Sequence, residues 1–372
     1  MHIAQVAPLV ESVPPKLYGG TERIISWLTE DLIALGHEVT LFASGDSVTS
    51  AALVPGCCCA LAPDATADLH VSYAVLLEKV SQMASDFDVI HCHTEWLHLP
   101  LVHRIGTPFV TTLHGRLDRP DLRRVAETFP NAPFVSVSDS QRAPQPDLNW
   151  LGTVHHGTPP DLLRPCFAPD TYLAFLGRIT PDKGPETAIR WAQAAGRSLR
   201  VAAKVPRGEK HYFEKHVAPL MGDDIDFMGE VDDLEKQSFL GKAAALLFPI
   251  DWPEPFGLVM IEAMACGTPV IATRRGAVSE IIADGVTGFL VDSEQEALAA
   301  ISRVAALDRR RVRDEFERRF TARRMTNDYV AIYQGLAVAR APVCRGLYRT
   351  PPTPALVPRD TSPRAAVDPT ST

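Results

Sequence analysis

The stretch DWPEPFGLVMIEAMACGTPV, residues 251–270, carries the strongest structural signal in the chain. The apolar residues 244–248 before it predict a short buried strand, and the prolines that follow force the chain out of the sheet. Apolar residues then recur at helical spacing: Leu258, Ile261, Met264 and Ala265. Gly267 and Pro269 end this helix, and residues 270–272 predict the next strand. The stretch therefore predicts a strand–loop–helix–strand unit of an α/β protein.

The start of this helix, near Phe256 and Gly257, predicts an anion site. A helix N-terminus offers unpaired N–H groups and the positive end of a dipole, and glycine lets a ligand approach the backbone closely. Glu254 precedes this point and Glu262 follows it, eight residues apart. Carboxylates beside a phosphate site are good acceptors for sugar hydroxyls. The structural alternative is a capping Glu254 and a surface Glu262.

This segment resembles the E-x7-E signature of retaining glycosyltransferases with the GT-B fold, the large family-four group that uses nucleotide-sugar donors. Glu254 and Glu262 fall on its acidic positions, and the segments 255–257 and 262–270 match it closely. The resemblance covers about residues 1–335. It implies an α/β protein of two facing Rossmann-like domains, with a C-terminal helix that crosses back to the first domain.

A Gly-Gly pair near the N-terminus predicts a second phosphate contact. Residues 2–7 predict a strand, Thr21 is a plausible N-cap, and the apolar spacing after it predicts a helix up to Gly36. Gly19 and Gly20 allow the backbone to approach a diphosphate at this helix N-terminus. The G-x-G-x-x-G dinucleotide fingerprint is absent. In the resembled family, a Gly-Gly loop at this place lies against the donor diphosphate.

Two sets of histidines follow predicted strands of this first half. The segment 112–115, Thr-Leu-His-Gly, resembles the T-x-H motif of the family, whose histidine approaches the donor sugar; this assigns His114 to the site. His91, His93 and Glu95 form a possible metal trio. Residues two apart in a strand share a face, so the two histidines do, but Glu95 lies beyond the carboxyl end of the predicted strand 88–92, and we predict no metal site.

The segment 177–184, Gly-Arg-Ile-Thr-Pro-Asp-Lys-Gly, lies just past a predicted strand of the second half. Arg178 suits bidentate phosphate contact and Lys183 acts as a point charge, so together they could neutralise a diphosphate. The alternative is two surface cations near a turn. The segment matches the family's G-R-x4-K-G motif. Gly229 and Val231 match the place where family members hold the nucleobase, largely through the backbone.

The pattern divides the chain into four parts. We predict an N-terminal acceptor-side domain at 1–157, a nucleotide-sugar donor domain at 158–322, a crossover helix at 323–340 and a disordered tail at 341–372. Residues 308–324 are rich in Arg with interspersed Asp and Glu. They predict a solvated helix face; the alternative is a weak peripheral contact with an anionic membrane surface.

Composition narrows the class of protein. The 372 residues carry a formal net charge of −8, which argues against a nucleic-acid-binding protein. Seven cysteines occur without paired metal spacing, and the run 57–59 predicts a surface loop, with a redox or metal site as the alternative. No leader pattern or membrane-spanning run is evident, so we expect cytoplasmic residence.

The resemblance implies a hexosyltransferase reaction with retention of anomeric configuration and a UDP-sugar as the favoured donor. Arg178, Lys183 and the helix N-terminus at 256–258, including Phe256, Gly257 and Leu258, would stabilise the leaving diphosphate, so no metal or other cofactor is expected. By the same resemblance, Glu254 holds sugar hydroxyls and Glu262 holds the ribose. The acceptor, a sugar, a lipid or another small molecule, cannot be read from the motifs. The alternatives are a GT-B sugar phosphorylase, a nucleotide-sugar epimerase or a non-catalytic nucleotide-sugar binding protein.

Overall fold

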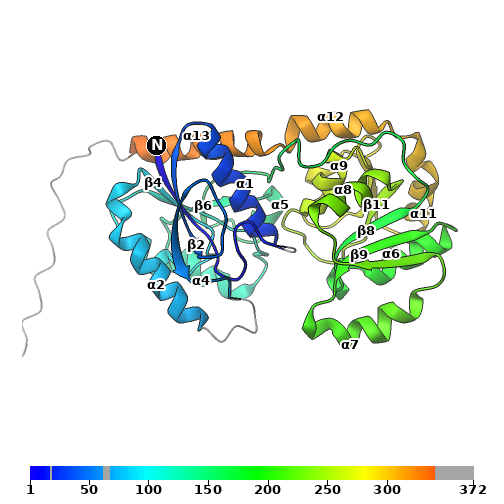
Figure 1. Ribbon diagram of the computed structural model, residues 1–372, viewed down its shortest axis with the longest axis horizontal. Helices are drawn as coiled ribbons and strands as arrows, with labels where there is room; N and C mark the ends of the chain where they lie inside the picture. The colour runs from blue at the N-terminus through cyan, green and yellow to red at the C-terminus, as the bar shows by residue number, and fades with distance from the viewer. Residues whose placement is uncertain (17–18, 62–67, 340–372) are drawn as a thin grey trace, which may run out of the picture. The chain divides into compact units, whose positions relative to one another are not determined.

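The first half of the chain forms a seven-stranded, fully parallel sheet (Figure 1). The computed structural model describes residues 1–16, 19–61 and 68–339. The strand order is β3-β2-β1-β4-β5-β6-β7. The strands are β1 (His2–Val6), β2 (Glu38–Ser44), β3 (Ala52–Cys57), β4 (Val89–Cys92), β5 (Phe109–Thr112), β6 (Pro133–Ser136) and β7 (Asn149–Thr153). The order reverses between β1 and β4, and ligands bind at the carboxyl ends of strands at such a switch point.

The helices of this half are α1 (Gly20–Ala34), α2 (Leu69–Gln82), α3 (Leu99–Val102), α4 (Arg123–Thr128) and α5 (Asp139–Arg142). The helix α1 buries Ile24, Leu28 and Leu32 against the sheet, as their spacing predicts. Its N-cap is Gly19 rather than Thr21, so the predicted cap is wrong by two residues. The strand β3 was not predicted, because Pro55 and Gly56 interrupt its pattern at the sheet edge.

The second half repeats this arrangement with six parallel strands in the order β10-β9-β8-β11-β12-β13. These are β8 (Leu173–Arg178), β9 (Leu199–Lys204), β10 (Ile225–Gly229), β11 (Ala245–Phe248), β12 (Val270–Thr273) and β13 (Gly288–Val291). The helices are α6 (Pro185–Ala194), α7 (Lys210–Tyr212), α8 (Asp233–Lys242), α9 (Leu258–Ala265), α10 (Val278–Ile281), α11 (Glu294–Arg303) and α12 (Arg309–Arg319). The switch point lies between β8 and β11. Both sheets therefore have Rossmann-like order, and the predicted α/β class is confirmed.

The last helix, α13 (Ala322–Ala339), returns to the first half and lies beside α1 (Figure 1). Its Met325, Tyr329 and Tyr333 are fully buried in the same cluster as Ile3 and Leu28. The predicted crossover helix is thus part of the first core.

The chain crosses between the halves twice, near Thr158 and near Thr321, and backbone hydrogen bonds join the two crossing segments. The Thr158 N–H donates to the Phe320 carbonyl over 2.9 Å, and the Ala322 N–H donates to the Thr158 carbonyl over 2.9 Å. A Cβ at Gly157 would lie 2.2 Å from the Thr321 carbonyl oxygen, so this close approach requires glycine. The predicted tail at 341–372 lies outside the described residues.

The Arg-rich segment is only partly the solvated face that was predicted. Arg309 and Arg313 of α12 are 9% and 8% exposed. The guanidinium of Arg313 donates to the carbonyls of Pro160, Leu163 and Ala265 over 2.6–2.9 Å. For these two arginines the prediction is wrong, because they satisfy loop and helix-end carbonyls instead of meeting water. Among the helices that the structure describes, none is long and apolar enough to cross a bilayer.

Candidate functional site

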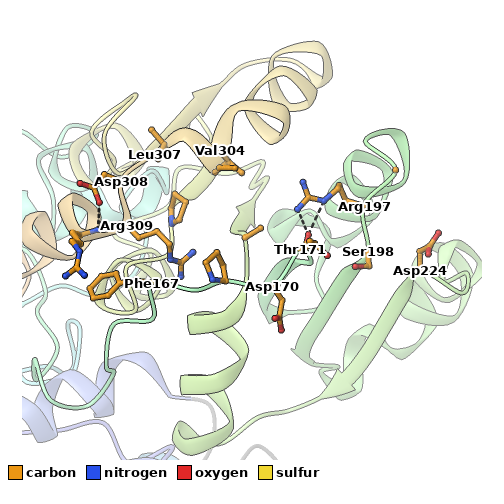
Figure 2. Close-up of a pocket in the computed structure, with 16 residues that line it drawn as sticks. Phe167, Asp170, Thr171, Arg197, Ser198, Asp224, Val304, Leu307, Asp308 and Arg309 are labelled. Carbon is orange, nitrogen blue, oxygen red and sulfur yellow. Dashed lines mark hydrogen bonds between the residues drawn. The ribbon is translucent and has the colours of Figure 1, made fainter.

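One cavity, of about 1050 Å³, lies at the amino ends of the second sheet (Figure 2). Arg309 donates to Cys166, Ala243, Gly241 and Thr268, so its polar atoms are already used. Arg197 donates to the carbonyl of Thr171, as Figure 2 shows. Because open α/β sheets bind ligands at the opposite, carboxyl ends of their strands, we do not assign the function to this cavity.

A second cavity, of about 540 Å³, lies at the carboxyl ends of strands from both halves. It brings together nearly all the residues predicted from the sequence: Gly19, Gly20, His114, Arg178, Lys183, Val231, Glu254, Phe256, Gly257, Leu258 and Glu262. Gly229 does not line it, although its neighbours Glu230 and Val231 do. Segments that are far apart in sequence therefore meet in one cavity, and the roles predicted for them remain predictions.

The helix α9 begins at this cavity, as the sequence of residues 251–270 predicts. Its N-cap is Gly257, with φ of +88°, and no side chain caps it. A Cβ at this position would lie 2.7 Å from Cε of Met260, so glycine is needed both for the conformation and for the space. The N–H groups of the first turn are thus directed at the cavity without a side-chain partner.

Glu254 is paired by two side chains that also line the cavity. The Nζ of Lys183 donates to Oε2 of Glu254 over 2.5 Å, and Trp252 Nε1 donates to the same oxygen over 3.0 Å. The ammonium also lies 4.5 Å from the centre of the Trp252 ring. Gly276 packs closely against the loop that carries Glu254. A Cβ at this position would lie 2.3 Å from the backbone nitrogen of Glu254, so the close approach requires glycine. The carboxylate and the cation are therefore one buried unit.

Glu262 is paired in the same way by a residue that the sequence did not indicate. Lys236, 8% exposed on α8, donates to Oε1 of Glu262 over 2.8 Å and lies 3.3 Å from Asp233. Asp233 in turn accepts from Arg23 of α1 over 2.6 Å. These ion pairs join α9, α8 and α1 around the cavity. Lys236 lies 26 residues from its partner and in no recognised motif, which explains why it was missed.

His114 belongs to a buried chain of hydrogen bonds. Its Nε2 lies 2.9 Å from Nδ1 of His93, and Nε2 of His93 lies 2.9 Å from Oε1 of Gln5. The amide nitrogen of Gln5 donates to the hydroxyl of Tyr333 on α13 over 3.2 Å. Since an amide oxygen only accepts, His93 donates from Nε2 and accepts at Nδ1, which assigns the proton of His114 to Nε2.

Burial keeps these rings neutral. It lowers the pKa of His114 to about 3, and lowers the pKa values of His93 and His156 well below the usual histidine range. His91 uses both ring nitrogens on Tyr333 and Thr112, at 2.7 Å each. Within the described residues no group of three potential metal ligands converges.

Glu95 stabilises the loop that carries His114. It has φ of +51°, which is uncommon for a residue with a side chain. Its carboxyl accepts from the backbone N–H groups of His114 and Gly115, while burial raises its pKa. Glu95 therefore positions the loop that carries His114. It is one of the three residues that the sequence offered as possible metal ligands.

Glu22 is a second cavity residue that the sequence did not single out. It lies in the first turn of α1 and is 7% exposed. Burial, followed by repulsion from Glu11, raises its pKa to about 7, and its own backbone N–H opposes this rise. Glu22 belongs to no sequence motif that we recognised. What distinguishes it is its burial, which only the folded protein shows.

Comparisons with known proteins agree with this geometry. Residues 18–160 match the profile described as Glycosyltransferase Family 4, and residues 167–321 match Glycosyl transferases group 1. A D-inositol 3-phosphate glycosyltransferase of Mycobacterium avium (strain 104) is 30% identical over 276 residues, 62% of this chain and 65% of that protein. The Arthrobacter sp. (strain FB24) protein of the same name is 27% identical over 338 residues, 75% of this chain and 79% of its own length.

Solved structures share the fold. The glycosyltransferase AviGT4, involved in avilamycin A biosynthesis, superposes with a TM-score of 0.70 at 25% identity, over 90% of this chain and 98% of its own. Sucrose-phosphate synthase of Thermosynechococcus elongatus gives 0.75 at 21% identity, over 91% and 99%. Anabaena Alr3699/HepE, solved with UDP and glucose, gives 0.70 at 19% identity, over 90% and 100%. The chain therefore belongs to the glycosyltransferases of the GT-B fold, with a Family 4 first half and a group 1 second half.

Proposed function

We propose that the chain transfers a sugar from a nucleoside-diphosphate donor, with a UDP-sugar favoured, to a hydroxyl group of an acceptor, with retention of anomeric configuration. One observation carries the proposal. A single cavity brings together the cations Arg178 and Lys183, the uncapped N-terminus of α9 and the buried carboxylates of Glu254 and Glu262. This is the set of groups that a sugar diphosphate requires.

The donor diphosphate binds between Arg178, Lys183 and the N-terminus of α9. Breaking the sugar–phosphate bond places negative charge on the leaving oxygen, and groups fixed beforehand stabilise that charge most effectively. When Lys183 turns from Glu254 to the phosphate, Oε2 of Glu254 is released to accept hydrogen bonds from sugar hydroxyls. The ion pair thus holds both side chains in position for two different parts of the donor.

The nucleoside binds further along the same cavity wall. Glu262, held by Lys236, accepts from the ribose hydroxyls, and the backbone near Glu230 and Val231 contacts the base. The cations of the protein supply the charge neutralisation in this proposal, so no metal ion takes part. The acceptor oxygen forms its bond to the anomeric carbon as the carbon–oxygen bond to phosphate breaks, on the same face. The acceptor proton passes to the leaving phosphate oxygen.

The names of relatives support the donor class. HepE was solved with UDP, with UDP-glucose and with UDP and glucose, and the curated relatives are named for inositol 3-phosphate as acceptor. A sugar phosphorylase or a nucleotide-sugar epimerase would use a similar cavity, and a binding protein would need no turnover. Product analysis separates these activities.

The experiment is a donor and acceptor screen followed by mass spectrometry. UDP-glucose, UDP-galactose, UDP-N-acetylglucosamine and GDP-mannose are each incubated with and without an acceptor mixture. A glycosylated acceptor plus a nucleoside diphosphate supports the proposal, and NMR of the product gives the anomeric configuration. Turnover that requires orthophosphate, a new nucleotide sugar without acceptor, or binding without turnover each contradicts it. Arg178→Ala serves as the inactive control.

A further inference from the structure

The cavity has an end formed by the first half of the chain, and the side-chain charges there differ from those around Arg178 and Lys183; the backbone of Gly19 and Gly20 at this end is the predicted diphosphate contact. The walls there are Val10 and Glu11 after β1, residues 19–23 at the start of α1, and the histidines 114 and 156. The charged side chains among these are Glu11, Glu22 and Arg23. Arg23 donates to Asp233 over 2.6 Å and closes the cavity toward α8. The two carboxyls of this end therefore outnumber its one cation, which is already paired.

The carboxyl of Glu22 is buried but still borders the cavity. It folds back toward the Gly-Gly turn, where a Cβ at Gly19 would lie 3.3 Å from Oε2 of Glu22. Within the part of the chain that the structure describes, the only donor to this carboxyl is its own backbone N–H. Burial to 7% exposure makes this carboxyl costly to ionise, and a ligand hydroxyl that donates to its spare acceptor positions would offset that cost.

The cation of this wall, Arg23, is paired with Asp233 on α8. His114 and His156 are neutral, because burial lowers both pKa values. Tyr73 of α2, whose pKa the charge of Glu22 helps to raise, uses its hydroxyl to accept from the Leu9 N–H over 3.2 Å. Lys16 is exposed and does not line the cavity.

Four cations line the other wall, Arg178, Lys183, Lys204 and Lys236, and three of them have a place in the proposed donor site. Lys183 and Lys236 pair with Glu254 and Glu262, and Arg178 lies with Lys183 at the proposed diphosphate site. A diphosphate brings enough negative charge to use these groups. A second phosphate, carried by the acceptor, would meet the carboxyls of Glu11 and Glu22 instead. At pH 8, above the pKa of Glu22 of about 7, the Glu22 carboxyl and the phosphate are both ionised, and like charges in a partly buried cavity repel strongly.

We infer that the acceptor is an uncharged polyhydroxyl compound, and that Glu22 binds one of its hydroxyls and excludes phosphorylated acceptors. This inference rests on the proposed function. It separates this chain from the relatives that are named for inositol 3-phosphate. Specificity of this kind combines an attractive contact for one ligand with a repulsive contact for its competitor.

The test uses acceptor pairs that differ by one phosphate: myo-inositol with its 1-phosphate, and glucose with glucose 6-phosphate. The assay uses the best donor of the screen. For each acceptor pair that the wild-type protein turns over, kcat/KM should be at least ~10-fold higher for the neutral member. Glu22→Gln should raise the KM for the neutral acceptor roughly 10-fold, as loss of a charge-assisted hydrogen bond does, and spare kcat and the Kd for UDP. Glu22→Lys should shift the preference toward the phosphorylated member.

Glu127→Gln, an exposed carboxylate of α4, is the matched control and should leave both KM values unchanged. If Glu22→Gln does not fold, Glu11→Gln reports the same charge effect. Preference of the wild-type protein for the phosphorylated member, or an unchanged neutral-acceptor KM in Glu22→Gln, overturns the inference while UDP still binds. Failure to bind UDP in calorimetry together with no donor turnover overturns the proposed function, and the inference with it.

Discussion

The Nζ of Lys183 lies 2.5 Å from Oε2 of Glu254, so two residues assigned by sequence to different parts of the donor are partners of each other. Their side chains are 13% and 9% exposed. Removing one member of a buried pair leaves the other charge without compensation. The effects of substituting these residues should therefore depend on each other.

This pair gives the first prediction. Lys183→Ala and Arg178→Ala should each lower kcat/KM by roughly 100-fold or more, because preorganised charge stabilisation is lost. Lys183→Ala should also destabilise the fold by about 3 kcal/mol, and adding Glu254→Gln should restore part of that stability. Urea unfolding of both single variants and the double variant measures the coupling. Strictly additive free energies would show that the pair has no mutual role.

The second prediction separates the two glutamates. Glu262→Gln should weaken binding of free UDP and of the intact donor alike, by about 1.5–3 kcal/mol, because both ligands carry the ribose. Glu254→Gln should spare UDP and weaken only the contacts with the sugar. Calorimetry with UDP and with the nucleotide sugar measures both. Equal loss of UDP affinity in the two variants would contradict the division of roles.

The third prediction concerns the pH dependence of stability. The pKa of Glu22 is about 7 in the folded protein, against 4.5 as its ordinary value, because of burial and the nearby Glu11. The folded state thus binds the proton more tightly, and its stabilisation is full below about pH 4.5 and lost as the pH rises through 7. Glu22→Gln should be more stable than the wild-type protein by up to ~3 kcal/mol at pH 8 and nearly equal at pH 4.

Thermal unfolding at several pH values measures this difference, with Glu127→Gln as the exposed control. A gap in Tm between Glu22→Gln and wild type that does not grow from pH 4 to pH 8 would mean that the carboxyl titrates normally. Glu22 would then be no more than a surface acid. A growing gap would show that the protein keeps a destabilising carboxylate in its cavity.

The fourth prediction concerns the proton positions in the histidine chain. Because Gln5 accepts from His93, the neutral ring of His93 should carry its proton on Nε2, and His114 should do the same. Nitrogen-15 NMR of the histidine side chains distinguishes the two tautomers. Gln5→Leu should leave a buried N–H unpaired, cost about 1–3 kcal/mol of stability and allow the other tautomer. An Nδ1–H signal for His93 in the wild-type protein would refute this chain.

The fifth prediction concerns the arginines of α12. Arg309→Met should cost several kcal/mol, because it leaves the carbonyls of Cys166, Ala243 and Gly241 without their buried donor. Arg311→Met, on the exposed face of the same helix, should stay within about 0.5 kcal/mol of wild type. Chemical denaturation compares the two, and similar values would indicate that Arg309 is as solvated as its neighbour.

The sequence predicts this fold and most of the cavity for a physical reason. Phosphate-binding groups sit at strand ends and helix starts, and glycines such as Gly257 and paired motifs such as that of Arg178 and Lys183 mark those points locally. Residues that act through burial leave no local mark. Lys236 pairs with Glu262 only when α8 and α9 pack together. The pKa of Glu22 is likewise raised only when the fold buries its carboxyl. The same reason explains why Arg309 and Arg313 looked solvated in an Arg-rich run.

The return of α13 to the first core also has a consequence for the order of synthesis. The first sheet is complete in sequence by residue 153, yet its core includes Met325, Tyr329 and Tyr333. During synthesis on the ribosome, the core of the first half therefore stays incomplete, with apolar surface exposed. It is completed only after almost the whole second half has emerged. Domains generally fold in the order in which they are translated, but here the half that is made first is the half that is finished last.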